Sequence, residues 1–140
     1  MSRSEGVAEY LVERMPFILA ELRDLVIPAF ECKVAAAGRK ATDPSAFVEG
    51  MERAFAEEIA MYFCDIAAAV DRKVCAMCRI EYADEEIVVE LHDHRSDPCT
   101  VLISAPEVIA PVKDAMARVA KQHLATRRHR HRQRAMNVNS

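Results

Sequence analysis

The chain has 140 residues, of which 51% are hydrophobic and 29% charged, and its net charge is −3. This length supports one hydrophobic core, and this balance of residue types excludes a chain that is disordered throughout. No apolar run approaches the roughly 18 residues that a bilayer-crossing helix needs, so an integral membrane protein is not expected. Glu5, Glu9 and Glu13 interrupt the stretch in which a secretion signal would be apolar.

Charge is distributed unevenly along the chain. Residues 127–140 contain five arginines and no acid, which leaves 14 basic and 22 acidic side chains in residues 1–126, a net charge of −8. The sequence therefore predicts a single acidic domain over 1–126 and a basic, flexible C-terminal arm over 127–140. The arginines of this arm are Arg127, Arg128, Arg130, Arg132 and Arg134.

Five cysteines, an odd number, stand in a chain in which no secretion signal is recognised. This favours free thiols in a reducing compartment over a disulfide framework. A cytoplasmic protein is the expectation.

The first 38 residues carry apolar side chains every three or four positions, which predicts one buried helical stripe. Ser2 or Ser4 can cap the start, and Ser2 has with Glu5 the spacing of a capping box. The expected buried positions are Val7, Leu11, Met15, Ile18, Leu22, Leu25 and Val26.

Three residues are expected to interrupt this helical region. Pro16 and Pro28 each lack an amide donor and clash with the preceding turn, so we expect a kink or break at both. Gly38 is the expected C-terminal stop, since glycine is the residue that most often follows a helix.

The clearest predicted element is a helix that ends near Asp71. Asp43 suits the N-cap and Pro44 the first helical position. Its predicted buried stripe is Phe47, Met51, Phe55, Ile59, Tyr62, Ile66 and Val70. Acidic residues away from that stripe form an expected partner-binding face, made of Glu49, Glu52, Glu57 and Asp65.

From Val74 the apolar spacing changes to two, which predicts a β-hairpin with one buried face. The apolar residues have even numbers on the first strand and odd numbers on the second, and both sets must lie on the same face. Residues directly opposite each other therefore have numbers that sum to an odd value, and we expect Tyr82 opposite Ile87. This register places Arg79 opposite Glu90, an oppositely charged pair on the solvent face.

A short third strand is predicted over residues 100–104 and a last helix from Pro111. The helix has an expected buried stripe of Val112, Met116, Val119, Ala120 and Leu124. The order of two N-terminal helices, a three-stranded antiparallel meander and a C-terminal helix predicts an α+β fold. In such a fold the helices cover one face of the sheet.

Side chains on the hairpin have the chemistry of a zinc site. In the expected register Cys75 lies opposite His94, and His92 projects to the same side of the strand as His94. These three would supply three zinc ligands, with Asp97 or Cys99 nearby for a fourth. The alternative is that they are ordinary exposed polar residues at the end of a strand.

The cysteine pair in Cys75-Ala-Met-Cys78 has the spacing of a redox motif. Both cysteines lie in a strand pattern, three residues apart, and so are expected on opposite faces, with Cys78 in the core. Cys75 with His94 is the one local pair that suggests nucleophilic catalysis, and no motif supplies an oxyanion hole or an orienting carboxylate. No catalytic residue is assigned, and we expect a protein that is not an enzyme.

The arm is the strongest functional signal in the sequence. Five guanidinium groups within eight residues can contact phosphates, and each contact adds salt-sensitive affinity. The arm contains no aromatic residue for base stacking, so non-specific binding to RNA or DNA is the expectation. The alternatives are docking of a protein partner and a solvated tail without a binding role.

Together these features favour a non-enzymatic regulator, inhibitor or adaptor that binds a larger protein or nucleoprotein partner through acidic helical faces. Proteins of phages and other mobile elements are among the candidates. The second interpretation is nucleic-acid binding through the arm, and the third is a metal or thiol site on the hairpin, with zinc as its cofactor. No membrane partner is expected. Apolar helix surface left uncovered by a small sheet is expected to form an interface, either of a homodimer or with another partner.

Overall fold

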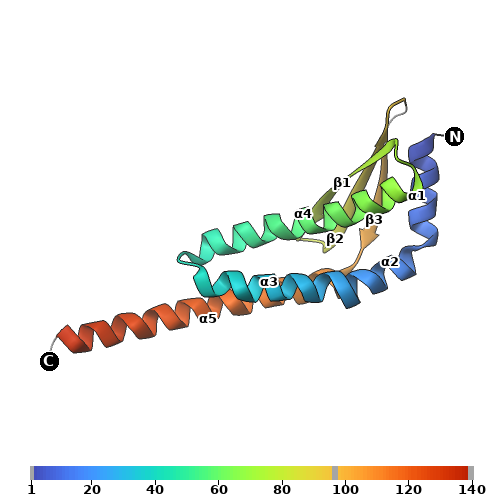
Figure 1. The fold of residues 1–140 in the computed structure, drawn as a ribbon. Coiled ribbons are helices and arrows are strands. Elements are labelled where there is room, and N and C mark those ends of the chain that lie inside the picture. Colours follow the sequence, from blue (N-terminus) through green and yellow to red (C-terminus); the bar gives the residue numbers. More distant parts are fainter. Residues whose placement is uncertain (1, 96–97, 139–140) are drawn as a thin grey trace.

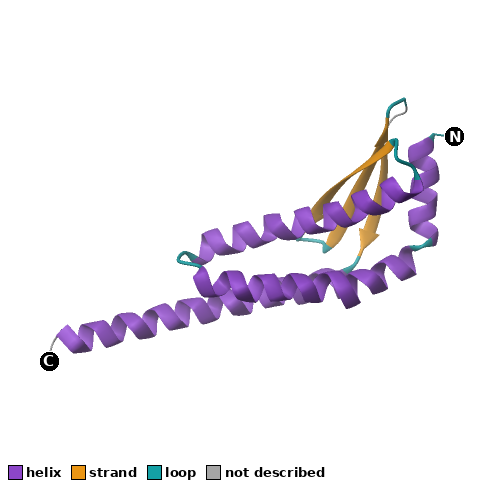
Figure 2. Cartoon of the chain, viewed as in Figure 1, coloured by secondary structure: helices purple, strands orange, loops and turns teal. Residues whose placement is uncertain are grey.

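The computed structural model describes residues 2–95 and 98–138, and side chains within 2–95 and 98–122. Three antiparallel strands in the order β1-β2-β3 form the sheet, and helices lie against one of its faces (Figures 1 and 2). The predicted α+β fold is confirmed. In chain order the elements are α1 (Arg3–Glu13), α2 (Met15–Glu21), the π-helical turn η1 (Leu22–Val26), α3 (Ile27–Lys40), α4 (Pro44–Val70), β1 (Val74–Glu81), β2 (Glu86–Asp93), β3 (Cys99–Ser104) and α5 (Pro106–Val138).

The prolines interrupt the N-terminal helices as predicted. The helix breaks at Arg14, just before Pro16, and Pro28 follows the π-helical turn η1. The prediction that Leu25 is buried is wrong, because its side chain is 65% exposed. In η1 the hydrogen bonds span five residues, with the Ile27 amide donating to the Leu22 carbonyl, so the next core position after Leu22 is Ile27.

The predicted stop at Gly38 is also wrong, since α3 continues to Lys40 and Ala41 is its C-cap. Gly38 is buried inside the helix, and a Cβ placed there would collide with the Val119 side chain of α5. Glycine is therefore needed here for the close approach of two helices, because only a residue without Cβ fits the gap.

Helix α4 begins and ends where the sequence predicts. The Asp43 carboxylate accepts a hydrogen bond from the Ser45 amide (3.0 Å), and the helix runs from Pro44 to Val70. After Ile59 its burial departs from the predicted stripe: Phe63 and Ala67 are fully buried, and the later predicted positions are half-buried or, at Val70, exposed.

The stripe shifts because the two halves of α4 contact different elements. Phe47 lies beside Gly38 of α3, whereas the Cys64 thiol donates a hydrogen bond to the Ala76 carbonyl of β1 (2.8 Å). Buried positions four residues apart advance by about 40° per step around a helix, since 3.6 residues make a turn. The buried line therefore winds from the helical layer toward the sheet.

The hairpin has the predicted faces but a register shifted by two residues. Ile80 lies opposite Ile87 and Arg79 opposite Val88, so the predicted pairs of Tyr82 with Ile87 and of Arg79 with Glu90 are wrong. The Arg79 guanidinium instead pairs with Glu81 on its own strand (3.1 Å). The inward-facing side chains are unchanged, because a shift of two preserves strand alternation.

Tertiary contacts of Tyr82 explain this register. Tyr82 leaves the strand, its hydroxyl donates to the Glu52 carbonyl of α4 (3.1 Å), and its own carbonyl accepts from the Lys113 ammonium of α5 (2.9 Å). The connection therefore occupies residues 82–85, with Glu85 in the left-handed region (φ 53°). Contacts with two distant helices cannot be inferred from the hairpin sequence.

Helix α5 begins at Pro106, and the predicted start at Pro111 is wrong. Pro111 lies inside the helix and is exposed, while Ile109 and Val112 on either side are fully buried. Burial of these flanking side chains offsets the missing amide donor of Pro111. The helical backbone continues to Val138 and extends past the end of the α3–α4 pair (Figure 1).

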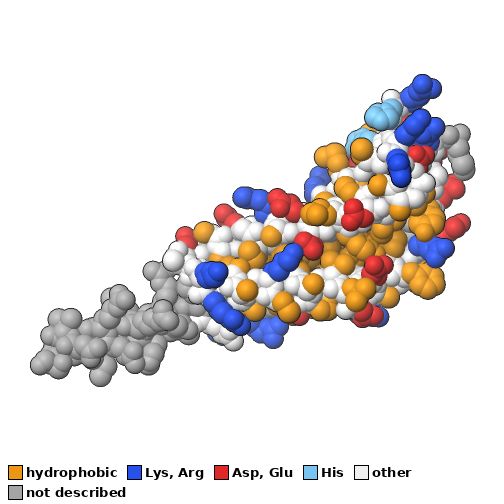
Figure 3. Space-filling model, viewed as in Figure 1, with side chains coloured by type: hydrophobic (Ala, Val, Ile, Leu, Met, Phe, Trp, Pro, Cys, Tyr) orange, Lys and Arg blue, Asp and Glu red, His pale blue; other side chains and the backbone are white. Residues whose placement is uncertain are grey.

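The described buried side chains form one core between the sheet and the helices, with Phe30, Phe55 and Phe63 as its largest members. The rings of Phe30 and Phe55 are 5.2 Å apart between centroids. In the view of Figure 3, hydrophobic side chains gather between α4 and α2, with charged side chains of both signs around them. Among the described residues, no helix has the length and hydropathy needed to span a bilayer.

Candidate functional site

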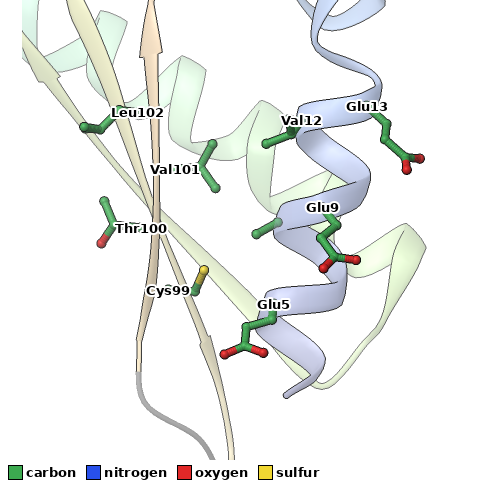
Figure 4. A pocket seen from close by; sticks show the side chains of 9 residues that line it. Glu5, Glu9, Val12, Glu13, Cys99, Thr100, Val101 and Leu102 are labelled. Carbon is green, nitrogen blue, oxygen red and sulfur yellow. The ribbon is translucent and has the colours of Figure 1, made fainter. Parts of the chain in front are cut away.

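A groove of about 640 Å³ runs between α1 and β3 (Figure 4). Its helical wall is the exposed side of α1, and its other wall is four consecutive residues of β3. The lining residues are Glu5, Ala8, Glu9, Val12, Glu13, Cys99, Thr100, Val101 and Leu102. Three of these described lining residues are carboxylates and none is a lysine or arginine, so the groove is acidic.

The groove is shaped by the way α1 is fixed to the sheet. The predicted capping box is present: the Ser2 hydroxyl accepts a hydrogen bond from the Glu5 amide, and the Glu5 carboxylate accepts one from the Ser2 amide. The Asp93 carboxylate at the end of β2 accepts hydrogen bonds from the Arg3 and Ser4 amides (3.0 and 3.2 Å). A carboxylate at a helix N-terminus is favourable because the free amides there carry partial positive charge. These contacts hold α1 beside β3.

The sequence of α1 divides the helix into a core side and a groove side. Val7 and Leu11 are almost completely buried against the sheet. The glutamates follow one another at intervals of four residues, so they form a neighbouring row along the helix. Val12 is 60% exposed next to this row, which adds an apolar element to an acidic wall.

The β3 wall exposes the edge of a strand. Successive strand residues point to opposite faces, so a groove that touches four consecutive residues includes the edge between those faces. Within residues 2–95 and 98–138, β3 pairs with β2 alone, and no strand pairs with its other edge. Leu102 is 64% exposed at this wall.

The residues of the expected zinc site lie differently from the prediction. Cys75 is directly opposite His92, not His94, and His94 lies beyond the end of β2. Within the part of the chain with described side chains, the ligand atoms of Cys75, His92 and His94 are not gathered within 4.8 Å of one another. Asp97 lies outside the described residues. The zinc site remains a prediction that this arrangement does not favour.

A different acidic cluster does converge. Carboxylate oxygens of Glu81, Asp84 and Glu86, at the hairpin connection, all lie within 4.8 Å of one another. Asp84 is exposed and the other two are half-buried, so water can solvate the cluster. Exposed carboxylates at a turn need no bound ion, and no site is assigned to them.

The cysteines of the Cys-Ala-Met-Cys motif point to opposite faces of β1, as predicted. Cys75 is exposed on the open face, and Cys78 is half-buried on the core side. Burial raises the pKa of the Cys78 thiol to about 12, and the nearby Cys64 adds to the rise. Cys78 is therefore a neutral thiol at physiological pH, unlike the thiolate that redox chemistry uses.

The acidic residues expected to form a partner-binding face on α4 are spread around the helix. At 3.6 residues per turn, Glu57 and Asp65 lie about 80° and 160° around the helix axis from Glu49. Glu52 lies about 60° from Glu49 in the opposite direction. Glu52 is half-buried and the other three are exposed. Their role in binding stays a prediction, and the α1 glutamates form the more compact acidic row.

The basic arm continues α5 as helical backbone to Val138. The side chains of Arg127, Arg128, Arg130, Arg132 and Arg134 lie outside the described residues, as does the Leu124 side chain of the predicted stripe. Their contacts are therefore not part of the candidate site.

Comparison of the chain with known protein families, curated protein sequences and solved structures finds no match. Sequence reasoning also missed the α1–β3 groove, since Glu5, Glu9 and Glu13 served only to exclude a secretion signal. Their spacing of four residues was the available signal. No sequence pattern predicts that a strand edge lies beside these glutamates, because that depends on where α1 crosses the sheet.

Proposed function

We propose that this protein is a small non-enzymatic regulator or adaptor that binds a larger protein or nucleoprotein partner, with the α1–β3 groove as its docking surface. The observation that carries the proposal is the combination, in one groove, of three carboxylates, exposed apolar side chains and a strand edge that no other described strand pairs with. Protein interfaces combine an apolar centre with a polar rim in this way.

The negative charge of the groove favours a partner with a basic surface. Complementary charge accelerates association and selects against acidic competitors, while apolar contacts contribute most of the affinity. Val12 and Leu102 are the exposed apolar side chains of the groove, one from each wall. A partner that covers both would remove apolar surface from water and place its cations beside α1.

The proposal is tested by a photoreactive benzoylphenylalanine at Leu102 in the full chain, irradiated in the native host. The matched control carries the same group at Met61 on α4, which is equally exposed (64%) and outside the groove. We expect a discrete protein adduct from position 102 and none from position 61. An adduct from position 61 alone would locate the partner elsewhere and refute the proposal for the groove.

A second candidate function is nucleic-acid binding through the arm. It is favoured by one observation: the backbone of α5 continues to Val138, past the end of the α3–α4 pair, and the sequence places five arginines on this extension. A projecting basic helix can approach a phosphate backbone without a clash from the acidic body.

A further inference from the structure

We infer that the partner docks as an extended segment that adds a fourth strand to the outer edge of β3, with basic side chains over the α1 glutamates. This inference rests on the proposed function and specifies the partner's chemistry, a peptide that alternates basic and apolar residues. The juxtaposition that supports it is the outer edge of β3, with which no strand in the described part of the chain pairs, beside the three glutamates of α1.

The edge of β3 offers the hydrogen bonds for strand addition. Only one edge of β3 is used by its ladder with β2, from the pair Leu91–Cys99 to the pair Glu86–Ser104. In an antiparallel ladder, alternate residues direct their amide and carbonyl groups to the other edge. An incoming strand would bond to these groups, as in other cases where a peptide extends a sheet.

The repeat of the glutamates matches that of an extended peptide. Glu5, Glu9 and Glu13 are four residues apart on a helix, a rise of about 6 Å per step. Alternate residues of a strand are about 6.6 Å apart and point to the same face. Figure 4 shows α1 alongside β3, with Glu5 toward the Cys99 end and Glu13 toward the Leu102 end. Glu5 and Glu9 therefore follow the repeat of successive basic side chains on one strand face, while Glu13, turned about 80° around α1 from Glu5, directs its carboxylate away from β3 in Figure 4.

The two faces of the added strand would meet different surroundings. On the side of Cys99 and Val101 the neighbour is α1, with its glutamates and Val12. On the side of Thr100 and Leu102 the neighbour is the open face of the sheet, where Leu102 is 64% exposed. Cations suit the first face and apolar side chains the second, which gives the alternating pattern.

The probe is a fluorescent peptide of about eight alternating lysine and valine residues, measured by anisotropy with the full chain. Two further peptides carry N-methyl groups on the valine amides or on the lysine amides. Because only alternate amides of an added strand bond to the sheet, we expect one methylated peptide to bind on the order of tenfold more weakly and the other to bind like the parent. Equal binding of both methylated peptides would overturn strand addition.

The acidic row is tested with the variant Glu5→Gln, Glu9→Gln, Glu13→Gln. Its matched control removes three exposed carboxylates that lie outside the groove and outside the α4 face, as Asp24→Asn, Asp84→Asn, Asp114→Asn. We expect the α1 variant to bind the peptide roughly tenfold more weakly and the control variant to bind it like the wild type.

The possible failures are distinguishable. Binding that weakens in the α1 variant but is equal for both methylated peptides refutes the added strand and leaves the proposed docking groove intact. No peptide binding, or equal binding by the α1 variant and the wild type, refutes the inference. The crosslink from position 102 decides the proposed function independently of both results.

Discussion

At the scale of single residues, the two glycines at positions 38 and 50 have opposite roles although both lie inside helices. A Cβ at Gly38 would collide with the Val119 side chain, whereas a Cβ at Gly50 would meet no atom within 4 Å. Gly38 is therefore required by the packing of α3 on α5. Gly50 only adds conformational freedom to the unfolded chain.

This contrast predicts opposite effects of alanine at the two positions. Gly38→Ala is expected to lower the free energy of unfolding by about 1–3 kcal/mol, because the core is overpacked. Gly50→Ala is expected to raise it by about 0.5–1 kcal/mol, because alanine favours the helix. Urea denaturation followed by circular dichroism measures both. Equal stabilities of the two variants would contradict the close approach of α3 and α5.

At the scale of elements, the contact of α4 with β1 and the following turn carries titratable groups that are favoured in their neutral forms. Burial raises the pKa of Cys78 to about 12. Burial also raises the pKa of Tyr82, and the nearby carboxylate of Glu52 adds to this shift. Loss of their protons would place negative charge in the contact between helix and sheet.

The contact of α4 with β1 therefore predicts a loss of stability in alkali. Since the folded pKa of Cys78 is above its ordinary value of 9.0, its contribution is fully present below pH 9 and declines as the pH rises toward 12. We expect the urea midpoint to fall over this range, and to fall less steeply in Cys78→Val, which cannot ionise there. A variant with the same alkaline decline as the wild type would exclude Cys78 as a cause.

At the scale of the whole molecule, charge is separated between an acidic body and a basic extension. The carboxylates of the groove lie on α1, and α5 carries the arginines toward the other end of the molecule (Figure 1). The proposed docking groove and the arm of the second proposal therefore lie toward opposite ends of the molecule and would not block each other. The expected homodimer remains a prediction.

The arm makes a prediction about salt. Each phosphate contact contributes about 0.9 to the slope of log affinity against log salt for duplex DNA, so five contacts would give a slope near 4.5. We expect a steep slope for the full chain with a duplex of about 20 base pairs over about 50–300 mM salt. The control replaces Arg127, Arg128, Arg130, Arg132 and Arg134 with glutamine. An unchanged slope in this variant would refute nucleic-acid binding by the arm.

The sequence by itself determined which elements form and which face of the hairpin is buried. Asp43 with Pro44 defined the start of α4, the capping box at Ser2 defined that of α1, and the change of apolar spacing at Val74 defined the hairpin. These signals are local, because a helix cap, a proline or an alternating apolar pattern affects only the backbone conformation of residues a few positions away. The α+β order follows from them.

Only the tertiary structure decided the details that depend on distant contacts. Tyr82 sets the hairpin register through its bonds to α4 and α5, and Gly38 is needed inside α3 because Val119 of α5 packs against it. The groove has the same origin: the spacing of the α1 glutamates is in the sequence, but the strand edge beside them depends on where Asp93 fixes the start of α1. Contacts between residues about 90 positions apart leave no periodicity in the sequence, since they are selected by the packing of whole elements.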